Sequence, residues 1–110
     1  MEKLNIMKVR QLENKNQYIL EDGEKTIFQS YDSIIAVYDN NNKTLTFGCD
    51  WDYSKTTLKH LYIYLRNEIY YNMTMDQKEE IRKALNSSNT RKALQKLIDN
   101  NIIKYESELI

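Results

Sequence analysis

One stretch decides the fold of this chain: Trp51-Asp52-Tyr53-Ser54-Lys55-Thr56-Thr57-Leu58-Lys59-His60-Leu61-Tyr62-Ile63-Tyr64-Leu65. Before it, apolar residues alternate with polar ones, which is typical of β-strands. Within it, they begin to recur every three or four residues, which is typical of an α-helix. Either Ser54 or Asp52 can cap this helix, because both side chains accept hydrogen bonds from the open N–H groups of a first turn. The pattern predicts an α+β fold in which a sheet precedes the helices.

The predicted helix runs from Ser54 to about Tyr70 and has apolar residues on two sides. One side, which we expect to lie against the sheet, carries Leu58, Leu61, Tyr62, Leu65 and Ile69. The other side carries His60, Ile63, Tyr64, Asn67 and Tyr71, and a basic ridge of Lys55, Lys59 and Arg66 lies on one flank. This second side either packs under the C-terminal part of the chain or faces a partner protein.

If the second side faces a partner protein, aromatic residues around the helix would supply contact area. The chain is rich in such residues, with nine Tyr and one Trp. The residues that this reading predicts to bind a partner are Tyr53, Lys59, His60, Ile63, Tyr64, Arg66 and Tyr71.

Short segments before the helix predict an antiparallel meander: Leu4–Leu12, Gln17–Glu21, Lys25–Ser30, Ser33–Tyr38 and Lys43–Cys49. Asp22-Gly23 predicts a tight turn, because glycine accepts the positive φ that such turns need. In the last segment, alternation predicts that Leu45, Phe47 and Cys49 face the core.

Two more helices follow the central one. Thr74 begins a predicted capping box with Gln77, and this helix extends to about Leu85. Thr90–Asp99 forms the next helix, and Ile102–Glu106 is a candidate last strand. Residues 1–110 are thus predicted to form a single α+β domain, with an antiparallel sheet of four to six strands, then three helices and a C-terminal strand.

The composition argues against several functional classes. The 16 basic and 16 acidic residues cancel, which is unlike a histone-like protein or an acidic mimic of DNA. The single cysteine and single histidine are too few for a zinc site, and the two glycines leave no phosphate loop. No signal peptide and no apolar run of about 18 residues is visible. We therefore expect a cytoplasmic protein without membrane span, cofactor or metal.

Two residue pairs are candidates for catalysis, Cys49 with His60 and Asp50 with Asp52. The alternation places Cys49 in the core, where a thiol behaves as a small apolar group. The aspartates fit a solvated strand end and a helix cap better than a shared proton. We predict no catalytic residues and no enzymatic activity.

An alternative function is DNA binding. The order helix, turn, helix and strand from Glu79 to Glu106 resembles a winged helix-turn-helix, whose second helix enters the major groove. The basic residues that could then contact nucleic acid are Arg82, Lys83, Arg91, Lys92 and Lys96. An ordinary helical hairpin with a solvated basic face is the favoured explanation of these residues, because the neutral net charge gives little non-specific affinity for DNA.

Two segments also carry a family resemblance. Gln29-Ser30-Tyr31-Asp32-Ser33-Ile34-Ile35-Ala36 and Trp51-Asp52-Tyr53-Ser54-Lys55-Thr56-Thr57 resemble the SYxSxIA and WDYSxTTxK patterns of small phage and plasmid proteins of Gram-positive bacteria. These proteins carry a domain of unknown function, and the resemblance covers residues 25–68 best. It implies a mobile-element protein in the bacterial cytoplasm. By analogy with small phage proteins, it implies binding to a host or phage protein, as an anti-CRISPR-like inhibitor of host defence or an inhibitor of another host factor. It names neither the partner nor the oligomeric state.

Overall fold

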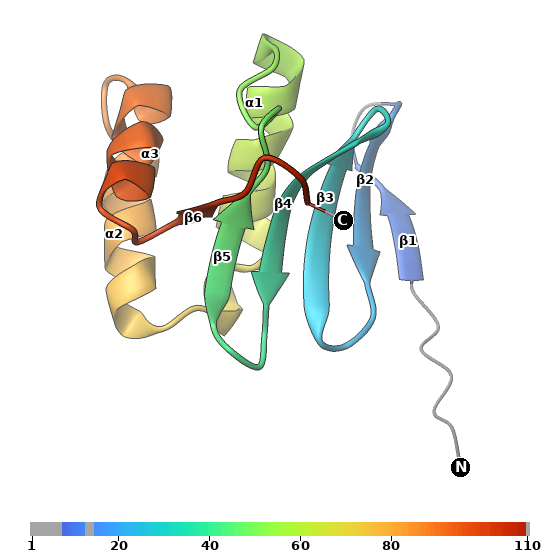
Figure 1. Ribbon diagram of the computed structural model, residues 1–110, viewed down its shortest axis with the longest axis horizontal. Helices are drawn as coiled ribbons and strands as arrows, with labels where there is room; N and C mark the ends of the chain where they lie inside the picture. The colour runs from blue at the N-terminus through green and yellow to red at the C-terminus, as the bar shows by residue number, and fades with distance from the viewer. Residues whose placement is uncertain (1–7, 13–14, 110) are drawn as a thin grey trace.

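The computed structural model describes residues 8–12 and 15–109, and these form an α+β fold around one six-stranded sheet (Figure 1). The strands are β1 (Lys8–Gln11), β2 (Gln17–Glu21), β3 (Lys25–Ser30), β4 (Ser33–Asp39), β5 (Thr44–Phe47) and β6 (Lys104–Tyr105). They lie in sequence order; β1 to β5 are antiparallel, and β6 joins parallel to β5. The predicted fold class is confirmed. The start of the predicted first strand, and part of the turn after it, lie outside the described residues.

Aspartates at strand ends hold two of the hairpin turns. Gly23 has a φ of 89°, and Oδ1 of Asp22 accepts hydrogen bonds from the N–H groups of Glu24 and Lys25 at 3.0 and 2.8 Å. The same donors lower the pKa of Asp22. Asp39 caps the β4–β5 turn in the same way, because its Oδ1 accepts hydrogen bonds from the N–H groups of Asn41 and Asn42. The predicted tight turn at Asp22-Gly23 is confirmed.

The helices follow the sheet as α1 (Lys55–Ile63), the π-helical η1 (Tyr64–Glu68), the 3₁₀ turn η2 (Tyr70–Asn72), α2 (Met75–Leu85) and α3 (Thr90–Asp99). Ser54 is the residue that caps α1, since its Oγ accepts from the N–H of Thr57 at 3.1 Å. The capping box of Thr74 and Gln77 is also present. The predicted α-helix from Ser54 to about Tyr70 is wrong in its second half, because the α-helix ends at Ile63 and the chain continues as the wider π-helix η1.

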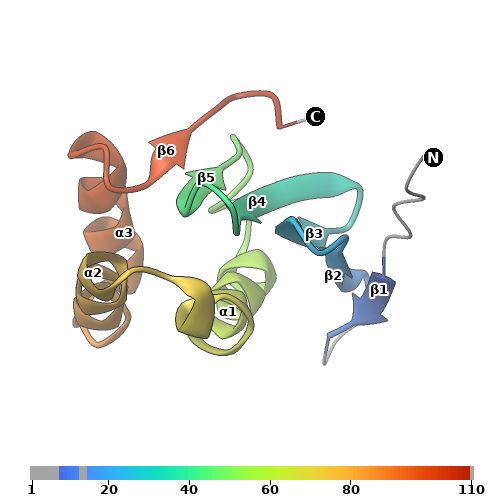
Figure 2. The ribbon, with the colours of Figure 1, turned by 90° about the horizontal axis from the view of Figure 1, so that it is seen from below.

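Figure 2 shows how the layers are arranged. α1 lies against one face of the sheet, α2 and α3 stand beside its β5–β6 edge, and the segment after β6 crosses the opposite face. β6 can pair parallel to β5 because the three intervening helices provide the long connection that a parallel pair requires. In the part of the chain that the structure describes, no helix has the length and apolar content needed to cross a membrane.

The buried face of α1 and η1 agrees only in part with the predicted one. Leu61, Leu65 and Ile69 are buried as predicted, but Leu58 and Tyr62 are only half-buried at the flank. Thr57, His60 and Tyr64 are buried in addition. The helix can turn this face to the sheet because the hydroxyls of Tyr64 and Thr57 find partners there. The Tyr64 hydroxyl donates to a β3 backbone carbonyl, and the Thr57 hydroxyl lies 3.0 Å from that of Ser30.

The end of β5 also differs from the prediction. Leu45 and Phe47 face the core as expected, but Cys49 is exposed, because the strand ends at Phe47 and the chain turns from Cys49 onward. Trp51 fills the core in its place, and its ring lies 5.3 Å from that of Phe47.

Candidate functional site

The predicted partner-binding residues do not share one surface. His60 and Tyr64 are fully buried within this chain, so the prediction that they meet a partner is wrong. The Tyr64 hydroxyl donates to a carbonyl of β3. Tyr71, which is 80% exposed, lies apart on η2 with its ring edge-on to Tyr70. Tyr53, Lys59, Ile63 and Arg66 remain accessible, and they lie in two separate hollows beside α1.

The first hollow lies on the outward face of α1 and η1, and we call it the α1 groove. It has a volume of about 500 Å³ and is lined by Lys55, Leu58, Lys59, Tyr62, Ile63 and Arg66. Leu58, Tyr62 and Ile63 form its half-buried apolar floor, and the three cationic side chains are exposed around it. Helical spacing places these residues on one side of the helix. The groove thus combines an apolar floor with a basic rim.

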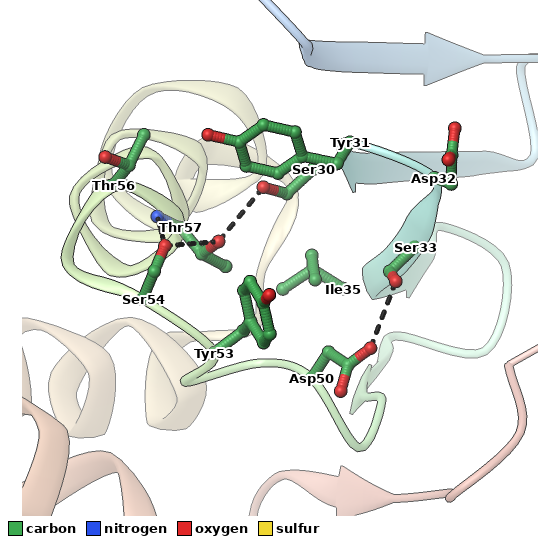
Figure 3. A pocket seen from close by; sticks show the side chains of 10 residues that line it. All are labelled: Ser30, Tyr31, Asp32, Ser33, Ile35, Asp50, Tyr53, Ser54, Thr56 and Thr57. Atoms are coloured by element: carbon green, nitrogen blue, oxygen red, sulfur yellow. Dashed lines mark hydrogen bonds between the residues drawn. The ribbon is translucent and has the colours of Figure 1, made fainter.

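The second hollow lies where the start of α1 meets the β3–β4 turn, and we call it the tyrosine pocket (Figure 3). It has a volume of about 620 Å³ and is lined by Ser30, Tyr31, Asp32, Ser33, Ile35, Asp50, Tyr53, Ser54, Thr56 and Thr57. All but Asp50 belong to the two segments that carry the sequence resemblance. The segments meet because the chain after β5 runs beside the start of β4, where the N–H of Gly48 donates to the carbonyl of Ile35 at 2.8 Å.

Hydrogen bonds fix the floor of the tyrosine pocket. The Thr57 hydroxyl lies 3.0 Å from Oγ of Ser30 and 3.1 Å from Oγ of Ser54. On the opposite wall, the Ser33 hydroxyl donates to Oδ2 of Asp50 at 3.0 Å, and Figure 3 shows this pair beside Ile35. These hydroxyl groups bind one another or a carboxylate, which holds the two segments together.

The candidate catalytic pairs are not assembled. The Cys49 thiol is exposed and points to Oδ1 of Asp50 at 3.8 Å, whereas His60 is buried and its Nδ1 lies 2.8 Å from the carbonyl of Thr56. The two aspartates have different partners: Asp52 forms an ion pair with Arg91 at 2.6 Å, whereas Asp50 accepts a hydrogen bond from the Ser33 hydroxyl. Within residues 8–12 and 15–109, no three histidine, cysteine or carboxylate side chains gather as a metal site.

The candidate nucleic-acid-binding residues are spread over α2 and α3. Arg91 donates through two nitrogens to Oδ2 of Asp52, and its guanidinium carbon lies 5.8 Å from the Trp51 ring centre. Arg82 and Lys83 lie within ion-pair distance of Glu79 on the same helix. Lys92 and Lys96 are exposed on α3. β6, the expected wing, is a strand of the main sheet instead.

Of the residues that line the tyrosine pocket, the sequence predicted only Tyr53 as a binding residue. Tyr31 and Asp32, which belong to the SYxSxIA pattern, occupy the turn between β3 and β4. Tyr31 adopts a positive φ of 55°, which is uncommon for a bulky residue. The only signal in the sequence was their place within a quoted motif.

A family model described as a family of unknown function (DUF8033) matches residues 1–84. The chain belongs to this family. Both the α1 groove and the tyrosine pocket lie within the matched part of the DUF8033 chain, whereas Arg91, Lys92 and Lys96 lie beyond it. No curated protein and no solved structure matches the chain.

Proposed function

We propose that this DUF8033 protein acts by binding another protein, and that its α1 groove receives an acidic segment that also carries apolar side chains. The observation behind this proposal is the combination of the half-buried floor with the exposed cations of the rim. Apolar side chains of a partner would lose contact with water against Leu58, Tyr62 and Ile63. Lys55, Lys59 and Arg66 would favour a partner with carboxylates over one with cations.

We propose further that the partner is a host factor, best a component of a bacterial defence system, which the protein inhibits in the host cytoplasm. This step rests on the resemblance of Ser30–Ala36 and Trp51–Lys59 to small phage and plasmid proteins. A chain of 110 residues is large enough to offer a partner protein an interface of modest size.

Binding, and not catalysis, is favoured by the roles of the carboxylates. Asp22 and Asp39 hold hairpin turns, Asp52 pairs with Arg91, and Glu79 pairs with Arg82. Each of these groups has a structural partner, which accounts for its place in the sequence without a reaction.

The first test is a charge reversal in the groove. A Lys55→Glu/Arg66→Glu double variant should keep its fold, because both side chains are exposed, and should bind the purified partner at least about tenfold more weakly. Ile63→Asp should also weaken binding, because it places a charge on the apolar floor. The partner is first captured from a host lysate and then purified for calorimetry, with thermal melting as the check on folding.

The matched control makes the same charge change on α3. Lys92→Glu/Lys96→Glu should leave partner binding unchanged, and full binding by the groove variant would overturn the proposal. The same control tests the DNA alternative. If the unmodified protein binds duplex DNA, loses affinity by orders of magnitude between about 50 and 200 mM salt, and loses binding in the α3 variant, it is a DNA-binding regulator instead.

A further inference from the structure

We infer that the tyrosine pocket binds the guanidinium group of an arginine side chain from the partner protein. This inference rests on the proposed function and adds a second point of attachment at the other side of α1. The pocket is open to solvent and, at about 620 Å³, is large enough for a side chain. Its ten lining residues come from two segments, 30–35 and 50–57, and none of these ten residues also lines the α1 groove.

Two tyrosine rings stand at the pocket, and both are exposed. Tyr53 is 72% exposed and Tyr31 is 47% exposed, although rings of this size gain free energy from burial. The Tyr31 backbone is held in its left-handed conformation, because its N–H donates to the carbonyl of Asn16 at 2.7 Å and its carbonyl accepts from the Gln29 side chain at 2.8 Å. The turn therefore keeps this ring at the pocket.

The charge of the lining selects a cation. Asp32 and Asp50 are the only charged groups that line the pocket, and neither has a cationic partner among the residues described in the structure. Within the described part of the chain, the donors to the Asp50 carboxylate are the uncharged Ser33 hydroxyl and the Cys49 thiol. An anion would be repelled by both carboxylates, although the start of α1 is near.

Three of the hydroxyl groups that line the pocket already have hydrogen-bond partners. The hydroxyls of Ser30, Ser54 and Thr57 bind one another, and Ser54 also caps the helix. A sugar or another neutral polyol would therefore find few open partners on the floor. The exposed tyrosine faces and the carboxylate oxygens remain, and a planar guanidinium can stack on the first while donating hydrogen bonds to the second.

The position of the pocket links it to the groove. Ser54 and Thr56 line the tyrosine pocket, whereas Lys55 between them lines the α1 groove. A partner with an arginine beside an acidic, partly apolar segment would match both hollows at once. Two weak attachments on one partner then act together, because the second forms at high effective concentration.

The direct test uses a small probe in place of the partner. N-acetyl-argininamide is titrated into the isotope-labelled protein, and the chemical shifts of the Tyr31 and Tyr53 rings and the Ile35 methyl groups are followed by NMR. We expect saturable shifts at these residues. N-acetyl-citrullinamide, which has nearly the same shape without the charge, should bind at least about tenfold more weakly. N-acetyl-lysinamide, a cation without the planar group, should bind with intermediate affinity.

Variants locate the site. Asp32→Asn/Asp50→Asn keeps the shape of both side chains and should weaken probe binding at least about tenfold. Tyr53→Ala should weaken it about threefold to fivefold, because the ring is exposed and its loss leaves the core intact. Asp76→Asn removes a carboxylate from an exposed position on α2 and should bind the probe like the unmodified protein.

Three results would overturn the inference: equal binding of the citrulline probe, unchanged binding by the double aspartate variant, or shifts that appear at other residues. The groove variant Lys55→Glu/Arg66→Glu separates this inference from the proposed function, since it should still bind the arginine probe. If the probe fails while the groove variant loses the partner, only the arginine site is wrong. If the probe binds as expected while the groove variant keeps the partner, only the proposed groove function is wrong.

Discussion

The ring of Tyr64 stacks on the ring of Phe28, with their centres 5.8 Å apart, and the Tyr64 hydroxyl donates to the backbone carbonyl of Thr26. This contact joins η1 to β3. It explains how a tyrosine can be fully buried, since both its ring and its hydroxyl have partners.

Truncation of Tyr64 should therefore destabilise the fold. Tyr64→Ala leaves a cavity against the sheet and should lower the free energy of unfolding by about 3–5 kcal/mol in urea denaturation. Tyr64→Phe keeps the ring but leaves the Thr26 carbonyl without this donor, and should cost about 1–2 kcal/mol. Tyr71→Ala is the exposed control and should change stability by less than about 0.5 kcal/mol. Equal effects of Tyr64→Ala and Tyr71→Ala would contradict the buried position of Tyr64.

Stability should also fall at alkaline pH. Burial raises the pKa of Tyr64 well above its ordinary value of 10.0, so the unfolded chain loses the phenolic proton before the folded chain does. Above about pH 10 the folded state therefore binds more protons than the unfolded state. The contribution of Tyr64 to the free energy of unfolding is fully present below about pH 10 and declines by about 1.4 kcal/mol per pH unit above that pH. Urea denaturation between about pH 9 and 11 should show a shallower decline for Tyr64→Phe. Parallel pH curves for the two proteins would contradict this.

Gln77 should contribute more to stability than Thr74, its partner in the capping box. Its Nε2 donates to the carbonyl of Lys43 at 2.6 Å, and its Oε1 accepts from the Tyr38 hydroxyl at 3.1 Å and from the N–H of Thr74 at 3.0 Å. Gln77→Ala breaks contacts with both α2 and the β4–β5 hairpin, and should cost about 2–3 kcal/mol. Thr74→Ala removes only a helix cap and should cost about 1 kcal/mol. Calorimetric melting that ranks them the other way would show that the link to the hairpin contributes little.

The Arg91–Asp52 contact should be a modest link between α3 and the start of α1. Both side chains are partly in solvent, so Arg91→Ala should cost no more than about 1 kcal/mol, and less in high salt. Arg91→Lys should recover only part of this, because lysine lacks the planar group that lies over Trp51. The neighbouring exposed residue gives the control, Lys92→Ala, which should leave the urea midpoint unchanged. A loss larger for Lys92→Ala than for Arg91→Ala would contradict this role.

Local features were predictable from the sequence because they depend on near neighbours. Lys25–Ser30 and Thr90–Asp99 have the predicted bounds, Gly23 takes the predicted positive φ, and the capping box at Thr74 forms as expected. Each depends on residues within about one turn of helix or one hairpin turn. The prediction that Cys49 faces the core was wrong because it also used only near neighbours. The apolar alternation with Phe47 continues in the sequence, but the strand itself ends at Phe47.

The sequence by itself determined the order of the strands, the turns, the helix caps and the α+β class, since these follow from apolar period and local hydrogen bonding. Only the tertiary structure decided which side of α1 is buried. Both sides carry apolar residues, and the choice depends on partners such as Thr26 and Ser30, which lie 38 and 27 positions away from the helix residues that they contact. The tyrosine pocket has the same origin, because the β4–β5 hairpin folds residues 30–35 against residues 50–57, and neither segment forms a hollow alone.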